Sequence, residues 1–155
     1  MEGHVKKNVV IANDHGAVDL KQLLVRHLQN RGYEVLNLGV DDEQSVDYPD
    51  MAEQGCREML KGGYEFLVLC CGTGIGISIS ANKIEGIRCA LPQNSFAARM
   101  AKEHNNVNAI AFGGRIEYPE PVTDMIDAFI DSEFQGGRHG TRVDKIMKLQ
   151  NCSLA

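Results

Sequence analysis

The 155-residue sequence has no excess of basic residues. Its 16 lysines and arginines stand against 21 aspartates and glutamates, which gives a formal net charge of −5. A protein that binds nucleic acid or an anionic membrane through a general positive field needs the opposite balance. We therefore expect neither nucleic acid nor a membrane as a partner, and a phosphate site would have to be built locally.

Targeting and membrane-spanning segments are also missing from the sequence. The segment from Met1 to Lys7 lacks the apolar stretch of a secretory signal, and no apolar run approaches the length that crosses a bilayer. The cysteines show neither the paired spacing of a zinc site nor the density of a disulfide scaffold. They are Cys56, Cys70, Cys71, Cys89 and Cys152. These features predict a soluble, cytoplasmic protein without a metal site.

Two common nucleotide-binding fingerprints are absent as well. The glycine-rich stretch Gly72-Thr73-Gly74-Ile75-Gly76 is followed by Ile77, where a dinucleotide fingerprint needs a third glycine. No Walker A lysine follows it either. No linker, repeat or low-complexity tract divides the chain, and 43% of its residues are hydrophobic. We expect a single domain over residues 1–155, with a C-terminal helical extension from about residue 136.

Short apolar runs alternate with helical patterns along the chain. Strands are expected at residues 8–12, 33–38, 66–71, 87–91 and 109–112. The first helical pattern places Leu20, Leu23, Leu24 and Leu28 on one face, and residues 122–130 give the clearest amphipathic helix. This order predicts an α/β fold, a Rossmann-like, doubly wound, five-stranded parallel sheet with helices on both faces in a three-layer α/β/α arrangement.

Polar residues follow three of the expected strands. Asp14 and His15 come after the first strand, Cys71 to Gly76 end the third, and Arg115 comes after the fifth. In such sheets ligands bind at the carboxyl ends of the strands, close to the point where the strand order reverses. We expect the functional site at this edge, with a loop over residues 45–49 placed to close over it.

Cys71 is the strongest candidate for chemistry. A glycine-rich turn that leads into a helix presents backbone N–H groups where negative charge can sit. A thiol beside such groups ionises more easily than a free thiol, and the thiolate can act as a base or a nucleophile. The alternation of side chains along a strand points Cys70 to the opposite face, as a small buried hydrophobe. On composition alone, the interpretation as a small buried hydrophobe stays open for Cys71 too.

At this point the sequence resembles the ribose-5-phosphate isomerase B family from Val9 to about Ile146. The resemblance rests on Asp14-His15-Gly16, Asp47-Tyr48-Pro49, the run from Cys71 to Ser78, Ala81-Asn82-Lys83, Gly86-Ile87-Arg88, His104-Asn105, the run from Ala111 to Arg115, and the run from Gly136 to Val143. That family, which includes galactose-6-phosphate and allose-6-phosphate isomerases, interconverts aldose and ketose sugar phosphates without metal or organic cofactor.

The resemblance implies an enzyme of pentose phosphate metabolism that interconverts D-ribose 5-phosphate and D-ribulose 5-phosphate through a cis-enediolate. Two alternatives remain open. An isomerase of a six-carbon sugar phosphate, such as allose 6-phosphate or galactose 6-phosphate, would need only a roomier pocket. A noncatalytic nucleotide-binding α/β module could share the architecture, although it would need neither Cys71 nor His104.

The resemblance also implies a role for each candidate residue. Cys71 would move a proton between C1 and C2, and His104 would help to open the furanose ring. The hydroxyl of Thr73 and the loop N–H groups would stabilise the enediolate as an oxyanion hole does. The loop residues are Gly72, Gly74, Ile75 and Gly76, the expected sugar contacts are Asp14, His15, Asp47, Tyr48 and Asn105, and the expected phosphate ligands are Arg115, Arg138 and Arg142. Some members of the family carry a glutamate in the loop in place of the cysteine, and this chain matches the thiol subtype.

Each of these roles has a simpler structural alternative. Asp14 would serve as a plain N-cap, His15 as an ordinary helix residue, and His104 as a helix C-terminal residue favoured by the dipole. Arg138 and Arg142 lie four apart, which suits either a solvated helix face or a phosphate dianion. The resemblance further implies a homodimer or a dimer of dimers with sites at the subunit interface.

Overall fold

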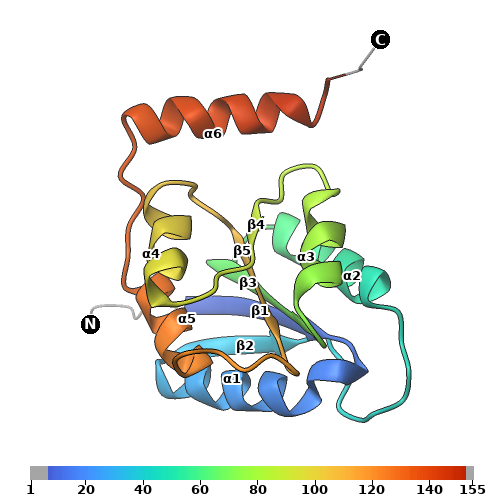
Figure 1. The fold of residues 1–155 in the computed structure, drawn as a ribbon. Helices are drawn as coiled ribbons and strands as arrows, with labels where there is room; N and C mark the ends of the chain where they lie inside the picture. Colours follow the sequence, from blue (N-terminus) through green and yellow to red (C-terminus); the bar gives the residue numbers. More distant parts are fainter. Residues whose placement is uncertain (1–6, 153–155) are drawn as a thin grey trace, which may run out of the picture.

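The computed structural model describes residues 7–152 (Figure 1). The strands are β1 (Lys7–Asn13), β2 (Tyr33–Asn37), β3 (Phe66–Cys71), β4 (Cys89–Ala90) and β5 (Ala109–Gly113). The helices are α1 (Val18–Asn30), α2 (Tyr48–Leu60), α3 (Ile75–Asn82), α4 (Ser95–Glu103), α5 (Val122–Ile130) and α6 (Arg138–Leu149), and a 3₁₀ turn, η1 (His15–Ala17), precedes α1. Most of the segment from Met1 to Lys7, which lacks the apolar stretch of a signal, lies outside the described residues.

The five strands form one parallel sheet in the order β2-β1-β3-β5-β4. One apolar cluster joins α1, α4 and α5 to one face of the sheet, and a second joins α2 and α3 to the other face. The predicted three-layer, doubly wound fold is therefore confirmed. The strand order reverses between β1 and β3, so these two strands flank the expected binding crevice.

Alternation along β3 separates its two cysteines. Cys70 is fully buried in the cluster under α1, α4 and α5, whereas Cys71 belongs to the cluster under α2 and α3. Burial raises the pKa of the Cys70 thiol far above its ordinary value. The two neighbouring thiols thus lie in different layers of the molecule, as the strand period predicts.

The stripe of α1 that faces the sheet differs in one position from the prediction. Leu24 and Leu28 are buried and Leu20 is half-buried, but Leu23 is 44% exposed. Lys21 is buried instead. The spacing from 21 to 24 to 28 follows the helical repeat, and Leu23 is turned about 100° from Leu24 on the helix. The prediction for Leu23 was wrong because, among several closely spaced leucines, the sequence alone does not show which of them face the sheet.

The fourth strand is shorter than residues 87–91. Only Cys89 and Ala90 pair with β5, on one side. On the outer side, the amide of Asn82 donates to the Cys89 carbonyl at 2.9 Å and accepts from the Cys89 N–H at 2.8 Å. This side chain closes the edge that another strand would otherwise extend.

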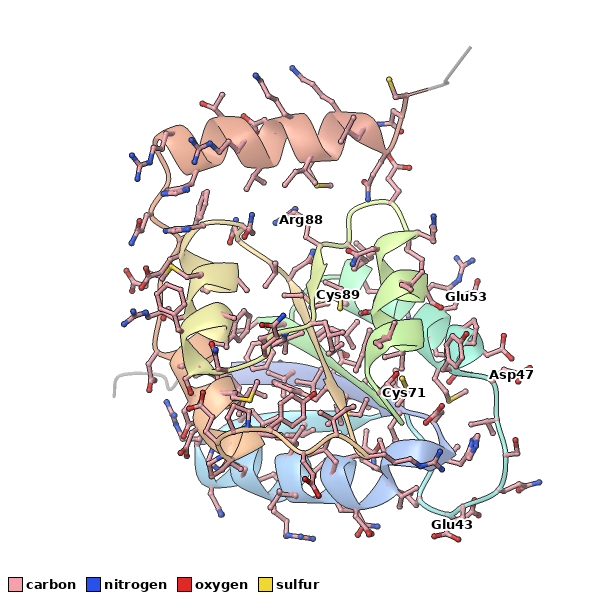
Figure 2. The ribbon with its side chains drawn as sticks, in the orientation of Figure 1. Glu43, Asp47, Glu53, Cys71, Arg88 and Cys89 are labelled. Atoms are coloured by element: carbon pink, nitrogen blue, oxygen red, sulfur yellow. The ribbon has the colours of Figure 1, made fainter. Side chains whose placement is uncertain are left out.

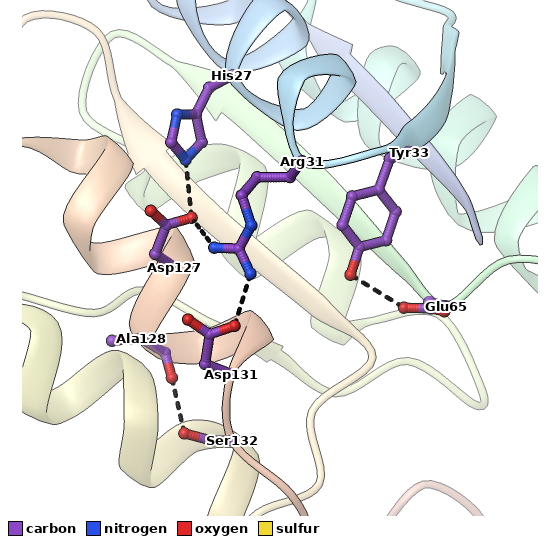
Figure 3. A network of polar contacts seen from close by, with 8 residues as sticks. All are labelled: His27, Arg31, Tyr33, Glu65, Asp127, Ala128, Asp131 and Ser132. Carbon is purple, nitrogen blue, oxygen red and sulfur yellow. Dashed lines mark hydrogen bonds and ion pairs between the residues drawn. The ribbon is translucent and has the colours of Figure 1, made fainter.

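A polar network ties α1 to α5 (Figure 3). The Arg31 guanidinium bridges Asp127 and Asp131, each at 2.6 Å, and His27 Nε2 lies 2.7 Å from Asp127. These carboxylates raise the pKa of Arg31. In the same view, the Tyr33 hydroxyl donates to Glu65 at 3.1 Å. The helix α5 is thereby held against α1 by ion pairs as well as by the packing of its apolar face.

The last helix is held more loosely. Figure 1 shows α6 lying across the top of the molecule, beyond the ends of α3 and α4. It starts after Gly136 and Gly137, which both have positive φ, and it buries His139 and Val143. Ile146 is 40% exposed and Leu149 is 71% exposed. No helix among residues 7–152 is long and apolar enough to cross a membrane.

Candidate active site

Three segments that follow strands meet at the carboxyl edge of the sheet. The Asp14 N–H donates to the Cys70 carbonyl at 3.1 Å, and the Gly114 N–H donates to the Cys71 carbonyl at 2.9 Å. The Arg115 N–H donates to the Gly72 carbonyl at 2.9 Å. A Cβ on Gly16 would lie 2.9 Å from the Gly72 nitrogen, so only glycine lets these turns approach so closely. The edge predicted from the sequence is built from these contacts.

Cys71 lies at the end of β3 and is 4% exposed (Figure 2). The Gly74 N–H donates to its sulfur at 3.1 Å. An amide directed at sulfur supplies positive partial charge where a thiolate would carry its negative charge. Gly74 has a φ of 75°, and it forms the N-cap of α3. The left-handed turn thus aims the start of α3 at the thiol.

Some backbone amides of the glycine-rich loop are hydrogen-bonded within the chain, and others are not. The Gly74 N–H is committed to the Cys71 sulfur, and the Ile75 N–H donates to the Thr73 hydroxyl oxygen at 3.2 Å. Within residues 7–152, the amides of Gly72, Thr73 and Gly76 have no hydrogen bond. These three N–H groups, with the Thr73 O–H, are the donors that remain for a bound oxyanion. Of the loop amides expected to stabilise an enediolate, those of Gly74 and Ile75 already have partners in this structure.

Tyr48, the first residue of α2, lies over the same loop. A Cβ on Gly76 would lie 2.6 Å from its ring. No side chain, and so no catalytic glutamate, fits at position 76 while the ring is there. The neighbouring Asp47 is the exposed N-cap residue of α2, and its carboxylate makes no capping hydrogen bond. Both side chains are left to contact a ligand at the loop.

His15 and Asp14 hold the turn after β1. The Asp14 carboxylate accepts the Gly16 N–H at 2.8 Å, which is the N-cap contact that the simpler alternative predicts. His15 Nδ1 accepts the Val46 N–H at 3.2 Å. Because a backbone amide can only donate, Nδ1 carries no proton there, and in the neutral ring the proton resides on Nε2. In this tautomer, His15 can donate a hydrogen bond through Nε2.

A cavity of about 400 Å³ opens beside this turn. Its lining includes His15 and Arg115 as well as the acidic residues Asp19, Asp41, Asp42 and Glu43. The Arg115 side chain runs along Gly72, with one guanidinium nitrogen 3.6 Å from where a Gly72 Cβ would be. The size of the cavity suits a small metabolite, and Arg115 supplies it with positive charge.

His104, Asn105, Arg138 and Arg142 lie at the other edge. His104 ends α4 before β5 begins at Ala109, whereas Cys71 pairs with Gly113 at the far end of β5. At about 3.3 Å per residue, the strand alone separates the two ends by roughly 13 Å. The Arg88 guanidinium donates to the Asn105 carbonyl at 3.1 Å, and Figure 2 shows Arg88 toward α6, away from Cys71.

The side chains at this second edge are arranged around a pair of imidazoles. The rings of His104 and His139 stack at 4.0 Å between centroids with a 7° interplanar angle. Burial lowers the pKa of His139, and His104, Arg138 and Arg142 lower it further. Both arginines are exposed, and neither forms an ion pair with a carboxylate among residues 7–152. Within residues 7–152, no carboxylate therefore neutralises the positive charges of Arg138 and Arg142.

His139 is the residue at this edge that sequence reasoning missed. It was part of the motif around Arg138, but no role was predicted for it. The helical spacing contained the signal, because His139 and Val143 form the buried side of α6 while Arg138 and Arg142 remain exposed. A histidine on the apolar side of an otherwise charged helix is the feature that marks it.

Within one chain, the predicted site residues thus form two groups at opposite edges of the sheet. The strand-end group consists of Asp14, His15, Asp47, Tyr48, Cys71, Gly72, Thr73, Gly74, Ile75, Gly76 and Arg115. The α6 group consists of His104, Asn105, Arg138 and Arg142. Among residues 7–152, no cluster of three or more histidine, cysteine, aspartate or glutamate side chains is arranged to hold a metal ion.

Comparison with known proteins adds the following. Residues 9–146 match the family model described as Ribose/Galactose Isomerase. Ribose-5-phosphate isomerase B of Escherichia coli is 36% identical over 144 residues, which cover 93% of this chain and 97% of the relative. The structure of ribose-5-phosphate isomerase B from Clostridium thermocellum aligns with a TM-score of 0.89 at 42% identity, covering 93% of this chain and 97% of that one. Type B ribose 5-phosphate isomerase from Leishmania infantum aligns with a TM-score of 0.88 at 38% identity, covering 94% and 97%.

Proposed function

Because the chain belongs to the ribose/galactose isomerase family, we propose that it is an isomerase that interconverts D-ribose 5-phosphate and D-ribulose 5-phosphate. Relatives that carry the name ribose-5-phosphate isomerase B match it along nearly their whole length. The observation in this chain that best supports the proposal is Cys71 at the end of β3, with the Gly74 N–H on its sulfur. A base in the same loop as a set of free backbone amides is what proton transfer next to a carbonyl needs.

In the proposed reaction, the Cys71 thiolate removes the proton from C2 of the open-chain aldose. The electron pair of the broken C–H bond forms the C1–C2 double bond, and the C1 oxygen takes up the negative charge of an enediolate. The free amides of Gly72, Thr73 and Gly76 stabilise that charge. The thiol then returns its proton to C1 while a proton passes from the C2 oxygen to the C1 oxygen, which leaves the ketose.

Ring opening and phosphate binding fall to the α6 group in this proposal. His104 gives a proton to the ring oxygen as the C1–O bond of the furanose breaks, and it takes up the proton that the anomeric hydroxyl loses as the aldehyde forms. Arg138 and Arg142, one helical turn apart on α6, bind the phosphate through charge-assisted hydrogen bonds. Arg115 approaches the same phosphate from the strand-end group.

A complete site then requires two chains, since the two groups lie at opposite edges of one chain. We propose a homodimer, or a dimer of dimers, in which the strand-end group of one chain meets the α6 group of its partner. The exposed, unpaired arginines support this arrangement, as do the exposed Ile146 and Leu149 on the loosely held α6. A symmetric dimer would contain two such sites.

We further propose a cytoplasmic location. All five cysteines are free thiols, including the adjacent Cys70 and Cys71. Free thiols in this number suit a reducing compartment.

A rate assay over a panel of five- and six-carbon aldose phosphates tests the proposed function. We expect the highest kcat/KM with ribose 5-phosphate, and we expect the Cys71→Ala protein, prepared in the same way, to show that no host enzyme contributes. A higher kcat/KM with allose 6-phosphate or galactose 6-phosphate would support the six-carbon alternative. Absence of turnover with every sugar phosphate, in a folded protein, would exclude an isomerase.

A further inference from the structure

Lys21 is the most unusual side chain that the proposed mechanism does not use. It projects from α1, and none of its side-chain surface is exposed. Lysine is almost never fully buried, because its ammonium group loses water on burial and needs strong partners in return. The contacts of this ammonium group therefore indicate the role of Lys21.

The ammonium group of Lys21 has two partners beyond the end of β2. It forms an ion pair with the Asp41 carboxylate, and it donates to the Asn37 side-chain oxygen at 3.3 Å. Asn37 in turn donates to the same Asp41 oxygen at 3.3 Å. Lys21 thus joins the start of α1 to the 38–47 segment, the stretch that connects β2 to α2.

The 38–47 segment is fastened to the strand ends at both of its own ends. Near its start, the Asn13 amide donates to the Val40 carbonyl at 3.1 Å. Near its end, the Val46 N–H donates to His15 Nδ1 at 3.2 Å. Asp41 lies between these two points, and the segment has no helix or strand of its own. Lys21 thus adds a polar contact next to Val40, in an irregular stretch whose Leu38, Val40 and Val46 side chains pack against the second apolar cluster.

The pair is asymmetric, and the asymmetry argues against a role in stability alone. The Lys21 side chain is 0% exposed, whereas the Asp41 side chain is 72% exposed. An apolar side chain of similar length would fill the space of Lys21 without the cost of removing a charge from water, and Asp41 would remain hydrated. A buried ammonium group is better explained by the geometry that it imposes on Asp41.

We propose that Lys21 is a positioning residue that holds the 38–47 segment in one conformation and thereby sets His15 and Tyr48 for substrate binding. The inference rests on the proposed function for its kinetic part. At the end of the segment, the Val46 amide fixes the proton of His15 on Nε2, and Asp47 and Tyr48 begin α2 over Gly76. We expect loss of the Lys21 contact to loosen the segment between its other contacts and to weaken both substrate contacts.

The test uses Lys21→Met, which keeps the length of the side chain and removes its charge. The matched control is Lys61→Met, because Lys61 also pairs with a carboxylate, that of Glu58 at 2.6 Å, but is 70% exposed and far along α2 from the site. Asp41→Asn is the second variant, since it weakens the same contact from the exposed side and leaves α1 unchanged.

Two readouts do not depend on activity. The ¹⁵N shifts of the His15 ring report which nitrogen carries the proton, and hydrogen exchange reports the protection of the Val46 amide. We expect Lys21→Met and Asp41→Asn to populate both His15 tautomers and to speed exchange at Val46, while Lys61→Met matches the original protein. With ribose 5-phosphate, the two site variants should raise KM by about tenfold with a much smaller change in kcat, as expected for a lost binding geometry.

The outcomes separate this inference from the proposed function. If the protein turns over no sugar phosphate, the proposed function fails, and the tautomer and exchange measurements still decide whether Lys21 positions the segment. If Lys21→Met and Asp41→Asn leave the His15 tautomer, the Val46 exchange rate and KM as they are in Lys61→Met, the inference is wrong. If Lys21→Met does not fold, Asp41→Asn decides the question by the same three measurements.

Discussion

The two edges of the sheet differ in how completely the chain satisfies its own polar groups. At the carboxyl edge, the turns after β1, β3 and β5 bond to one another, and a single amide is committed to the Cys71 sulfur. At the amino edge, two exposed arginines and a stacked pair of histidines lie where α6 is loosely held. The first edge is held by the chain's own hydrogen bonds, whereas the second presents positive charge outward. This difference is what the proposed two-chain site requires of each chain.

The last two helices also differ in how firmly the rest of the chain holds them. The helix α5 buries Met125, Ile126 and Phe129 and carries the carboxylates that hold Arg31. The helix α6 buries only His139 and Val143 within the described chain. Since burial of apolar surface is what usually fixes a helix, α6 is held less firmly than α5 by the described chain.

Replacement of Cys71 is expected to have the largest effect. Cys71→Ala should lower kcat by at least roughly 10²-fold, since a positioned general base contributes about that much or more. Cys70→Ala is the matched control, because it removes the neighbouring thiol from the opposite layer and should affect mainly the free energy of unfolding. Steady-state kinetics and urea unfolding of both variants test this. Equal losses of kcat in two folded variants would remove Cys71 from its proposed role.

Replacement of the α6 arginines should act on affinity instead. Arg138→Ala and Arg142→Ala should each raise KM for ribose 5-phosphate by roughly 10- to 100-fold, as for the loss of one charge-assisted hydrogen bond to a dianion. Arg99→Ala is a control, since Arg99 is an exposed arginine on α4 that lies 3.9 Å from Glu103. A fall in kcat at unchanged KM would show that the arginines do not bind the phosphate in the ground state.

His104→Asn should distinguish the two directions of the reaction. Ribose 5-phosphate must open its ring, whereas ribulose 5-phosphate has no furanose ring to open. We expect kcat, measured at saturating substrate, to fall several-fold more for the aldose than for the ketose, within the range of about 10²- to 10⁴-fold that general acid–base catalysis supplies. The two kcat/KM values must fall equally, because the equilibrium constant fixes their ratio. Initial rates at saturating substrate in both directions provide the measurement. Equal falls of kcat would assign His104 to a step common to both directions.

His139 should give the smallest effect, on stability as a function of pH. Its pKa is lowered in the folded chain, so the unfolded chain binds a proton first as pH falls below the ordinary histidine value near 6.5. The free energy of unfolding should therefore decrease between pH 7 and 5.5. His139→Gln should show a shallower decrease at the same protein concentration. Parallel curves for the two proteins would mean that His139 contributes nothing to this dependence.

The sequence predicted the sheet and the carboxyl edge because both follow from local patterns. Apolar runs set β1, β3 and β5, and the polar residues directly after them had to meet at one edge. Leu23 and Lys21 were harder to assign, because the hydrophobic pattern of α1 does not show that an ammonium group is held by Asp41, which is twenty residues away in sequence. The stack of His139 on His104 depends on the place of α6, which no local pattern determines.

The division of the site into two groups was partly accessible from the sequence. A helix that connects two parallel strands runs back along the sheet, so His104 at the end of α4 must lie at the amino edge. Cys71, at the end of a strand, must lie at the other. What the sequence could not provide is the direction of α6 after Gly136 and Gly137, since glycines at positive φ allow many directions.

Subunit complementation tests the central claim most directly. Cys71→Ala chains keep their α6 group, and Arg138→Ala/Arg142→Ala chains keep their strand-end group, so a mixed dimer would contain one intact site and one doubly impaired site. Measured at limiting ribose 5-phosphate after verified subunit exchange, an equal mixture should recover about a quarter of the original activity, since half of the dimers are mixed and each has one working site of two. If exchange is complete and the activity stays at the level of the separate variants, the two groups do not form one site across chains.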